Sequence, residues 1–567
     1  MAEAGTKLKL EKCAAFVPEY DRDGGSEHPS ITSVKQVHGG LPALGAAYGG
    51  EYESLLGAFS VAAEPARRRL DSARALLREC AEFAEEGHSI ATRQAAWIIA
   101  QKVACRALQY DVRTLESKEV LPLARELETE MQRTAERLAS SNPEEWSQFV
   151  AMQSRWPTEL GGLGMGSPTL AAKCGRIACI AQCLPVARAH LRKMFPEVDD
   201  ESILAAVSLE DVQLTLQEFA QEGIELNTSG RLASGSEPRL NLMRNFQPVR
   251  GVMGELMRTL FVQERNHVLT ALEQVAARSG GNAAGRQAVR SQVRLRSCCG
   301  GSSGWIEAIP ARNTLRLRDA EFVTGVRWRL GLPVCKPGKC QLCPVKYGDM
   351  PSLAEDACGI CLDPQGDHVV SCKKGGGAQR VHGAVGRVLG SAARDAGAEC
   401  NFEVTVPELL KGTPGGEDAV EAILDVHIWS VYPCPLEVWV DVTCRHPHAA
   451  RYRSRAAALD GEAARVGEED KAKRYGPGVA GVVVTTAAIE SWGRMAPGFE
   501  MLLGRLEALW AARHFAGPAE TAAVARRWRH EIGIAQVKCL HRSIEMAQRG
   551  SVSGVVSAPV VETQASQ

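Results

Sequence analysis

Apolar side chains recur every three or four positions along most of the first half of the chain, which is the spacing of amphipathic helices. This pattern predicts helices over residues 64–87, 89–113 and 117–139, and further helices up to about residue 221 and over residues 240–278. Pro65 and Gly87 stand where a helix typically begins and ends. The first half is therefore predicted to be α-helical, with its apolar stripes in the core and a connecting segment over residues 222–238.

The pattern changes to alternation between residues 419 and 443. Two alternating runs, Glu421–Trp429 and Leu436–Thr443, flank a turn that contains Tyr432, Pro433 and Pro435, which predicts a β-hairpin. Side chains along a strand point alternately to opposite faces. One face of this hairpin is therefore purely apolar, because it carries Leu424, Val426, Ile428, Leu436, Val438, Val440 and Val442.

The other face of the hairpin carries one aspartate on each strand, Asp425 and Asp441. If the hairpin closes symmetrically about Pro433, the two lie opposite each other, with Cβ atoms roughly 4.5–5.5 Å apart. Two like charges at that distance repel, so the arrangement favours a cation between them, and a divalent metal bound by carboxylate oxygens is the first candidate. The alternative is a solvated outer face with chance aspartates.

The order of elements around the hairpin is also informative. Residues 378–397 are predicted to form a helix, residues 400–406 a strand, residues 450–475 a helix and residues 479–486 a short strand. The order is then helix, three strands, helix, strand. A C-terminal helix is expected over residues 516–550, followed by a small, polar and disordered tail over residues 551–567.

Composition limits the class of protein. The chain has 567 residues, of which 45% are hydrophobic and 23% charged, which predicts about three globular domains. Neither a signal peptide nor an apolar run of 18 residues is visible, so we expect a soluble intracellular protein with no membrane partner.

Positive charge is concentrated in one region of an otherwise nearly neutral chain. Between residues 286 and 329 only Glu307, Asp319 and Glu321 offset the arginines, which predicts contact with a polyanion such as nucleic acid; a solvated helix surface is the alternative. The arginines are Arg286, Arg290, Arg294, Arg296, Arg312, Arg316, Arg318, Arg327 and Arg329. Arg286, Arg290, Arg294, Arg296, Arg316 and Arg318 are the candidate phosphate contacts.

Six of the 18 cysteines fall between residues 335 and 372, and in a reducing compartment such clustering favours metal binding over disulfides. The spacing C-x2-C-x6-H-x3-C predicts a structural zinc site made by Cys358, Cys361, His368 and Cys372. A second set, Cys335, Cys340 and Cys343, could bind another zinc ion. Alternatively, Cys340 and Cys343 could pair with Cys358 and Cys361 in a zinc ribbon, and sequence alone does not partition these ligands.

The element order around the hairpin resembles the core of the restriction-like PD-(D/E)xK nucleases, and the two aspartates stand where that family places its Mg²⁺ ligands. Such sites also need a lysine that orients water or offsets charge in the transition state. Thr443 occupies the usual lysine position, two after Asp441, so Lys471 or Lys473 on the next helix is the expected substitute. Glu403 is a candidate third carboxylate, and His382 is interpreted as structural.

A CCHC zinc knuckle followed by such a nuclease domain resembles the C-terminal region of non-LTR retrotransposon polyproteins, where a displaced lysine near a K-x-x-K-Y type motif also occurs. Here that motif reads KAKRY and is altered in its spacing. The segments GTKLKLEKCAAFVP, GGLPALGAAYGG and WPTELGGLGMGS resemble parts of the same proteins that follow the reverse transcriptase active site. The resemblance implies nicking of target DNA to prime reverse transcription, contact with element RNA, a separate polymerase partner and a nuclear location. No YxDD or FxDD is present, so polymerase activity is expected to be absent and the chain is expected to be a fragment.

We therefore predict a multidomain protein with a helical, thumb-like N-terminal half, a small zinc module and an α/β restriction-endonuclease-like C-terminal domain. The main hypothesis is a Mg²⁺-dependent endonuclease; the alternative is a non-catalytic nucleic-acid-binding remnant. The predicted division is 1–60 (palm-end remnant), 61–222 (thumb-like), 223–330 (linker and basic region), 331–376 (zinc knuckle), 377–515 (nuclease), 516–550 (terminal helix) and 551–567 (tail).

Overall fold

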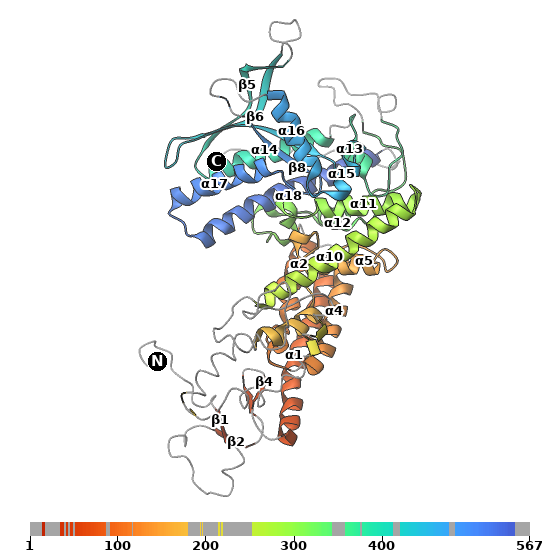
Figure 1. Cartoon of the computed structure of the whole chain (residues 1–567), viewed down its shortest axis with the longest axis vertical. Helices are drawn as coiled ribbons and strands as arrows, with labels where there is room; N and C mark the ends of the chain where they lie inside the picture. The colour runs from red at the N-terminus through yellow and green to blue at the C-terminus, as the bar shows by residue number, and fades with distance from the viewer. Residues whose placement is uncertain are drawn as a thin grey trace.

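A helical arm and an α/β head make up the described part of the chain in the computed structural model (Figure 1). The structure describes residues 52–86, 91–115, 117–179, 252–342, 358–374, 377–411, 420–475 and 484–549, together with four N-terminal strands and a few single positions. The four strands are β1 (Ala14–Val17), β2 (Lys35–His38), β3 (Leu41–Ala43) and β4 (Ala46–Tyr48). The predicted connection over residues 222–238 and the predicted tail over 551–567 lie outside the described residues.

The arm is built on two long helices that pack along each other, α1 (Tyr52–Glu85) and α4 (Ser117–Leu138). Both were predicted, but α1 begins at Tyr52, so Pro65 lies inside the helix and not at its start. Shorter helices complete the arm, and the helix predicted over residues 89–113 is divided between two of them. One apolar core runs through the arm, but Ile99 and Val103, in the stripe predicted for residues 89–113, are exposed. The shorter helices are α2 (Thr92–Lys102), α3 (Asp111–Thr114) and α5 (Gln148–Arg155).

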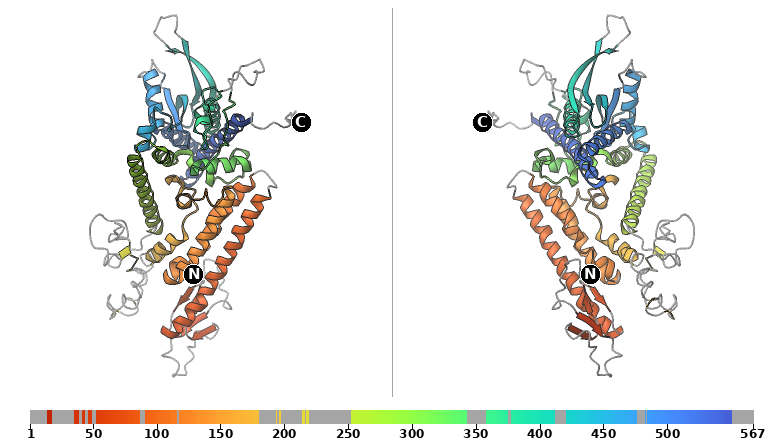
Figure 2. Two further views of the ribbon diagram at one scale, coloured as in Figure 1. Left: turned by 90° about the vertical axis from the view of Figure 1, so that its right-hand side faces the viewer. Right: turned by 90° about the vertical axis from the view of Figure 1, so that its left-hand side faces the viewer.

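Three helices connect the arm to the head: α10 (Val252–Arg278), α11 (Ala283–Ser297) and α12 (Asp319–Leu330). Figure 2 shows α10 and the α1–α4 pair leaving the head on opposite sides. The core of the arm continues through Phe322 of α12 to Ile534 of α18 (Pro518–Gln548), so arm and head share buried apolar contacts.

The head contains one four-stranded sheet in the order β5-β6-β7-β8. Its strands are β5 (Glu399–Lys411), β6 (Val420–Ser430), β7 (Leu436–Arg445) and β8 (Val484–Glu490). The β5–β6 and β6–β7 pairs are antiparallel, and the β7–β8 pair is parallel. In the hairpin, Val426 pairs with Val440 and Ser430 with Leu436, which is the predicted register, symmetrical about Pro433.

The apolar face of the hairpin is buried, as predicted. Val426, Ile428, Val438 and Val440 are at most 1% exposed. They share a core with residues of α14 (Gly377–Asp395), α17 (Pro497–His514) and α18. A strand register is strongly specified when one face is buried, because a slip of one residue would turn every apolar side chain outward.

The helix predicted over residues 450–475 is two helices, α15 (Arg453–Ala458) and α16 (Glu462–Tyr475). Gly461 directly precedes α16 with a positive φ of 73°, a left-handed conformation that glycine adopts easily, and its carbonyl accepts the N–H of Arg465 in the first turn of that helix. Among the described helices, none is long and apolar enough to cross a membrane.

Candidate metal sites

The two aspartates of the hairpin lie where strands β6 and β7 separate. Their ladder ends at the pair Val426 and Val440, and from Asp441 onward β7 continues to pair with β8. Beyond that pair, a side chain takes the place of the backbone hydrogen bonds between the strands: Oδ2 of Asp425 accepts the backbone N–H of Val442 at 2.6 Å. Asp425 is part-buried and Asp441 is buried. The fork thus brings the two carboxylates close together, as predicted, and it also partly encloses them.

A histidine joins this pair. Nε2 of His382 lies 3.0 Å from Oδ2 of Asp425, and the ligand atoms of His382, Asp425 and Asp441 all lie within 4.8 Å of one another. The hydrogen bond to Asp425 raises the pKa of His382, although partial burial opposes the shift. The interpretation of His382 as structural missed this contact.

The position of His382 follows from the packing of α14 on the sheet. A Cβ at Gly386 would lie 3.8 Å from a methyl group of Val426 and 4.0 Å from one of Val442, so α14 lies close to both strands at this point. His382 precedes Gly386 by four residues and therefore lies on the same helix face, one turn earlier. That turn brings it to Asp425. In the sequence, the only indication of this contact was a histidine four residues before a glycine that allows close packing. Such a pair is too common to predict a metal site.

The lysine of the site comes from α16. Nζ of Lys471 donates to Oδ2 of Asp441 at 2.6 Å, and the hydroxyl of Tyr475 donates to the same oxygen. Burial and the contact with Asp441 raise the pKa of Tyr475. Lys473 is exposed and points elsewhere on the helix. Of the two candidate lysines, the structure thus brings Lys471 to the carboxylates.

A glycine allows α16 to approach the sheet closely enough for this contact. A Cβ at Gly467 would lie 3.2 Å from Cγ2 of Thr443 and 3.2 Å from the side chain of Arg445, which is tighter than ordinary van der Waals contact. Thr443, at the usual lysine position, is itself buried under this helix. Lys471 follows Gly467 by one helical turn and therefore reaches back to Asp441.

Glu403 is not part of this group. It lies on β5 between the pairs Phe402–Val426 and Val404–Leu424, which is the register position beside Asp425, but its side chain is exposed. Its φ is 52°, a left-handed value that costs a residue with a side chain about 1 kcal/mol or more. The structure therefore does not bring the predicted third carboxylate to the other two.

The cysteine cluster forms a second candidate site, with one change from the predicted ligands. Cys340, Cys358, His368 and Cys372 offer ligand atoms within 4.8 Å of one another. Sγ of Cys358 lies 3.4 Å from Nε2 of His368, close to the roughly 3.6 Å between sulfur and nitrogen in a tetrahedral zinc site. Three sulfurs and one imidazole suit zinc. The predicted ligand Cys361 is exposed and outside this group, so that assignment is wrong.

Backbone hydrogen bonds explain the exchange of ligands. The N–H of Cys340 donates to the carbonyl of Ile360, and the N–H of Cys358 donates to the carbonyl of Leu342, so the two segments run side by side. This alignment places Cys340 next to Cys358 and leaves the Cys361 side chain outside. Cys335 is buried but outside the group. Cys343 lies outside the described residues.

Asp367, next to the zinc ligand His368, connects this module to the sheet. Its carboxylate accepts hydrogen bonds from Nε and Nη2 of Arg290, at 2.7 and 2.9 Å. It also lies 3.0 Å from Nδ1 of His448 and 3.4 Å from Nε2 of His446. Burial raises the pKa of Asp367, but the contacts with the histidines and Arg290 outweigh it, so the pKa lies well below its usual value. Because Arg290 bonds to both oxygens, a metal ion here would face a guanidinium. We interpret this group as an ion-pair junction.

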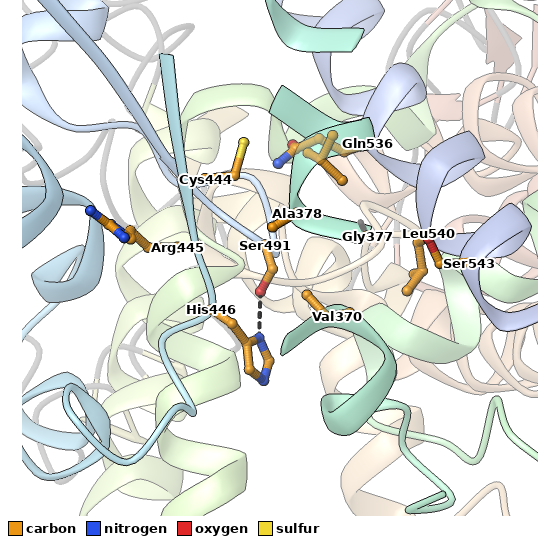
Figure 3. A pocket seen from close by; sticks show the side chains of 11 residues that line it. Val370, Gly377, Ala378, Cys444, Arg445, His446, Ser491, Gln536, Leu540 and Ser543 are labelled. Carbon is orange, nitrogen blue, oxygen red and sulfur yellow. Dashed lines mark hydrogen bonds between the residues drawn. The ribbon is translucent and has the colours of Figure 1, made fainter. Parts of the chain in front are cut away.

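A small cavity lies beside this junction, between α13 (Asp367–Ser371), α14, the end of β7 and α18 (Figure 3). Nδ1 of His446 lies 2.8 Å from Oγ of Ser491 there, so Ser491, His446 and Asp367 form a chain of contacts. The cavity measures only about 40 Å³. That volume holds a water molecule or two and no substrate, so the chain of contacts is interpreted as structural.

Burial changes the interpretation of the arginine-rich region. Arg290 and Arg294 are 5% and 1% exposed, so the prediction that they contact phosphate is wrong. Arg294 bonds to Gln153 and to the carbonyl of Arg329, and burial lowers its pKa to about 10. Arg296 bonds to Asp460 at 2.9 Å.

The other three arginines predicted to contact phosphate have exposed side chains. Arg318, which directly precedes α12, pairs with Glu321 of that helix. Arg286 and Arg316 are exposed and bond to nearby backbone carbonyls. These three guanidinium groups remain on the surface, so the candidate phosphate contacts are fewer than the sequence predicted.

No protein-family model matches this sequence, and a search of curated proteins found no match either. The function of the chain is therefore inferred from the geometry of its own residues.

Proposed function

We propose that this protein is a metal-dependent endonuclease whose active site is the fork between β6 and β7. The observation that carries the proposal is the convergence of Asp425, Asp441 and Lys471 from two strands and a helix. Oδ2 of Asp441 is 2.6 Å from Nζ of Lys471, and both carboxylates lie within reach of one ion. Two carboxylates and a lysine are the groups that metal-assisted phosphodiester cleavage needs.

Each residue has a role that follows from its contacts. Activation of water and stabilisation of charge at the phosphate are the chemistry that a divalent ion supplies when bound by such carboxylates. Asp425 is held in place by the Val442 amide, and Asp441 by Tyr475. The ammonium of Lys471 offsets the negative charge that develops on the phosphate or orients the attacking water.

The wider context is proposed from sequence resemblance. In a non-LTR retroelement protein, the site would nick target DNA so that the cut end primes reverse transcription, with the zinc module helping to hold nucleic acid. DNA, element RNA and a separate polymerase would be the partners, and the nucleus the location. The resemblance calls for a displaced lysine, and Lys471 supplies one, whereas the altered spacing of the KAKRY motif favours the alternative given below.

Nicking of supercoiled plasmid DNA by the full chain, with Mg²⁺ or Mn²⁺ present, tests the proposal. Asp425→Ala and Asp441→Ala should each lower the rate at least about 100-fold, because each removes a ligand of the proposed ion. Glu437→Ala is the matched control. Glu437 lies on β7, as Asp441 does, but its carboxylate is exposed and contacts His427. Equal nicking by all four proteins would identify a contaminating nuclease and reject the proposal.

The alternative is a non-catalytic nucleic-acid-binding remnant, and the observation that favours it is Thr443 in the usual lysine position. Binding of DNA without nicking in any divalent metal would establish that alternative. The contact between Lys471 and Asp441 favours the active enzyme, because it places a cation beside the carboxylate pair in the absence of a lysine at position 443.

A further inference from the structure

The imidazole of His382 approaches the carboxylate pair from α14, an element that contributes neither aspartate. We propose that His382 is a third ligand of the ion at this site, and that the site consequently prefers a first-row transition-metal ion such as Mn²⁺ to Mg²⁺. The inference concerns the same site as the proposed endonuclease and rests on that proposal for its role, but it is tested by metal binding itself.

The distances suit coordination. When each metal–ligand bond is about 2.1 Å, adjacent ligands of an octahedral ion lie about 3 Å apart and opposite ligands a little more than 4 Å apart. Nε2 of His382 is 3.0 Å from Oδ2 of Asp425, and no pair of ligand atoms in the group is more than 4.8 Å apart. Small side-chain rotations would therefore bring all three onto one ion.

His382 is not needed to hold Asp425 in place. Oδ2 of Asp425 already accepts the Val442 amide at 2.6 Å, which fixes the carboxylate to the neighbouring strand. The imidazole is 26% exposed, so an ion can reach it from solvent. Lys471 bonds to Oδ2 of Asp441, so Oδ1 could bind an ion without breaking that contact.

The ligand set determines which ions fit. Mg²⁺ prefers an all-oxygen environment and keeps several of its waters, whereas imidazole nitrogen favours borderline transition-metal ions. A site of two carboxylates and one imidazole should therefore discriminate against Mg²⁺ more strongly than a site of two carboxylates alone.

The test uses the full chain with zinc already bound, so that the Cys/His cluster does not compete for the added metal. Isothermal titration with Mn²⁺ and with Mg²⁺ compares the unaltered protein, His382→Asn and His427→Asn. His427 is the matched control, because it lies on β6 two residues after Asp425 and contacts Glu437 and Trp439. His382→Asn should weaken Mn²⁺ binding about tenfold or more and Mg²⁺ binding less than about threefold; His427→Asn should change neither.

Pulsed electron paramagnetic resonance of bound Mn²⁺ provides the direct readout. The unaltered protein should show nitrogen coupling from an imidazole ligand, and His382→Asn should lose it. Absence of the coupling in the unaltered protein, or its persistence in His382→Asn through His446 or His448, would overturn the proposal. So would an equal loss of affinity for both metals. Because the first measurement needs no variant, a variant that fails to fold does not prevent the test.

The two proposals fail in different ways. Nitrogen-coupled Mn²⁺ binding without nicking would support His382 as a ligand and reject the endonuclease. Nicking that depends on Asp425 without any nitrogen coupling would support the endonuclease and reject His382 as a ligand.

Discussion

Nζ of Lys471 lies 2.6 Å from Oδ2 of Asp441, although 30 residues separate them in the chain. A lysine two positions after Asp441 would stand at Thr443, on the same strand as the carboxylate. Here Thr443 is buried under Gly467, and the cation comes from α16. The lysine is therefore positioned by the packing of a helix on a sheet, and changes in that packing should affect the chemistry.

Removal of the Lys471 ammonium should abolish most of the nicking activity. We expect Lys471→Ala to lower the rate of plasmid nicking about 100-fold or more, the usual cost of losing one group that stabilises transition-state charge. Lys473→Ala is the control, because Lys473 is exposed on the same helix. Equal losses in the two variants would mean that both lysines act only through general attraction to DNA.

A methyl group at Gly467 should separate α16 from the strand. The new Cβ would lie 3.2 Å from side-chain atoms of Thr443 and Arg445. We expect α16 to move away by a few tenths of an ångström and to carry Lys471 with it, because Thr443 is buried and has little room to shift. We expect Gly467→Ala to lower the nicking rate about tenfold, since small misplacements of catalytic groups are costly. Gly504→Ala on α17 is the control: a Cβ there meets no atom within 4 Å, and alanine should stabilise the helix by about 0.5–1 kcal/mol.

The melting temperature of Gly467→Ala shows whether a change in its nicking rate comes from loss of stability. A fall in nicking together with an unchanged melting temperature would assign the effect to the position of Lys471. An unchanged nicking rate would show that α16 adjusts without moving the lysine, and would contradict the role given to this glycine.

The hairpin could be predicted because its sequence leaves one solution. Seven apolar residues on one face must be buried together, which excludes a slip of one residue, and the turn around Pro433 fixes the register. In that register, Asp425 and Asp441 necessarily lie close to each other. Regular periodicity likewise predicted the long helices of the arm. The start of α1 was missed because a proline removes a backbone hydrogen bond and normally marks the first turn of a helix, whereas α1 continues through Pro65.

Residues brought together from distant segments could not be predicted in the same way. His382 reaches Asp425 because α14 packs on the sheet at Gly386, and Cys340 reaches Cys358 because two loop segments align through backbone hydrogen bonds. Neither contact follows from local spacing. The buried arginines were assigned to the surface because a charged side chain is rarely enclosed, and only the fold shows that Arg294 is.

The exchange of Cys361 for Cys340 predicts a clear difference in zinc content. Cys340→Ser should lose the ion or bind it much more weakly, because a hydroxyl is a poor zinc ligand, whereas Cys361→Ser should keep one equivalent. Metal analysis of the purified proteins after dialysis measures this directly. Zinc loss in Cys361→Ser with full retention in Cys340→Ser would restore the ligand set that spacing alone favoured.

The buried arginines should contribute to stability and the exposed ones to nucleic-acid binding. Arg329 is 2% exposed and donates to the carbonyls of Thr158, Gly162 and Ser303 at 2.7–2.8 Å. Arg329→Ala removes three hydrogen bonds to backbone carbonyls and the packing of a buried side chain, so the free energy of unfolding should fall by about 3 kcal/mol or more. Denaturant unfolding measures this change.

The exposed Arg316 is the matched comparison for Arg329. Arg316→Ala should change the free energy of unfolding by less than about 0.5 kcal/mol. If its guanidinium contacts a phosphate, the variant should also reduce the salt dependence of DNA binding by about one unit in the slope of log K against log salt. A stably folded Arg329→Ala protein with weakened DNA binding would contradict the structural role, because an enclosed guanidinium can affect DNA binding only by holding together the fold that presents the surface.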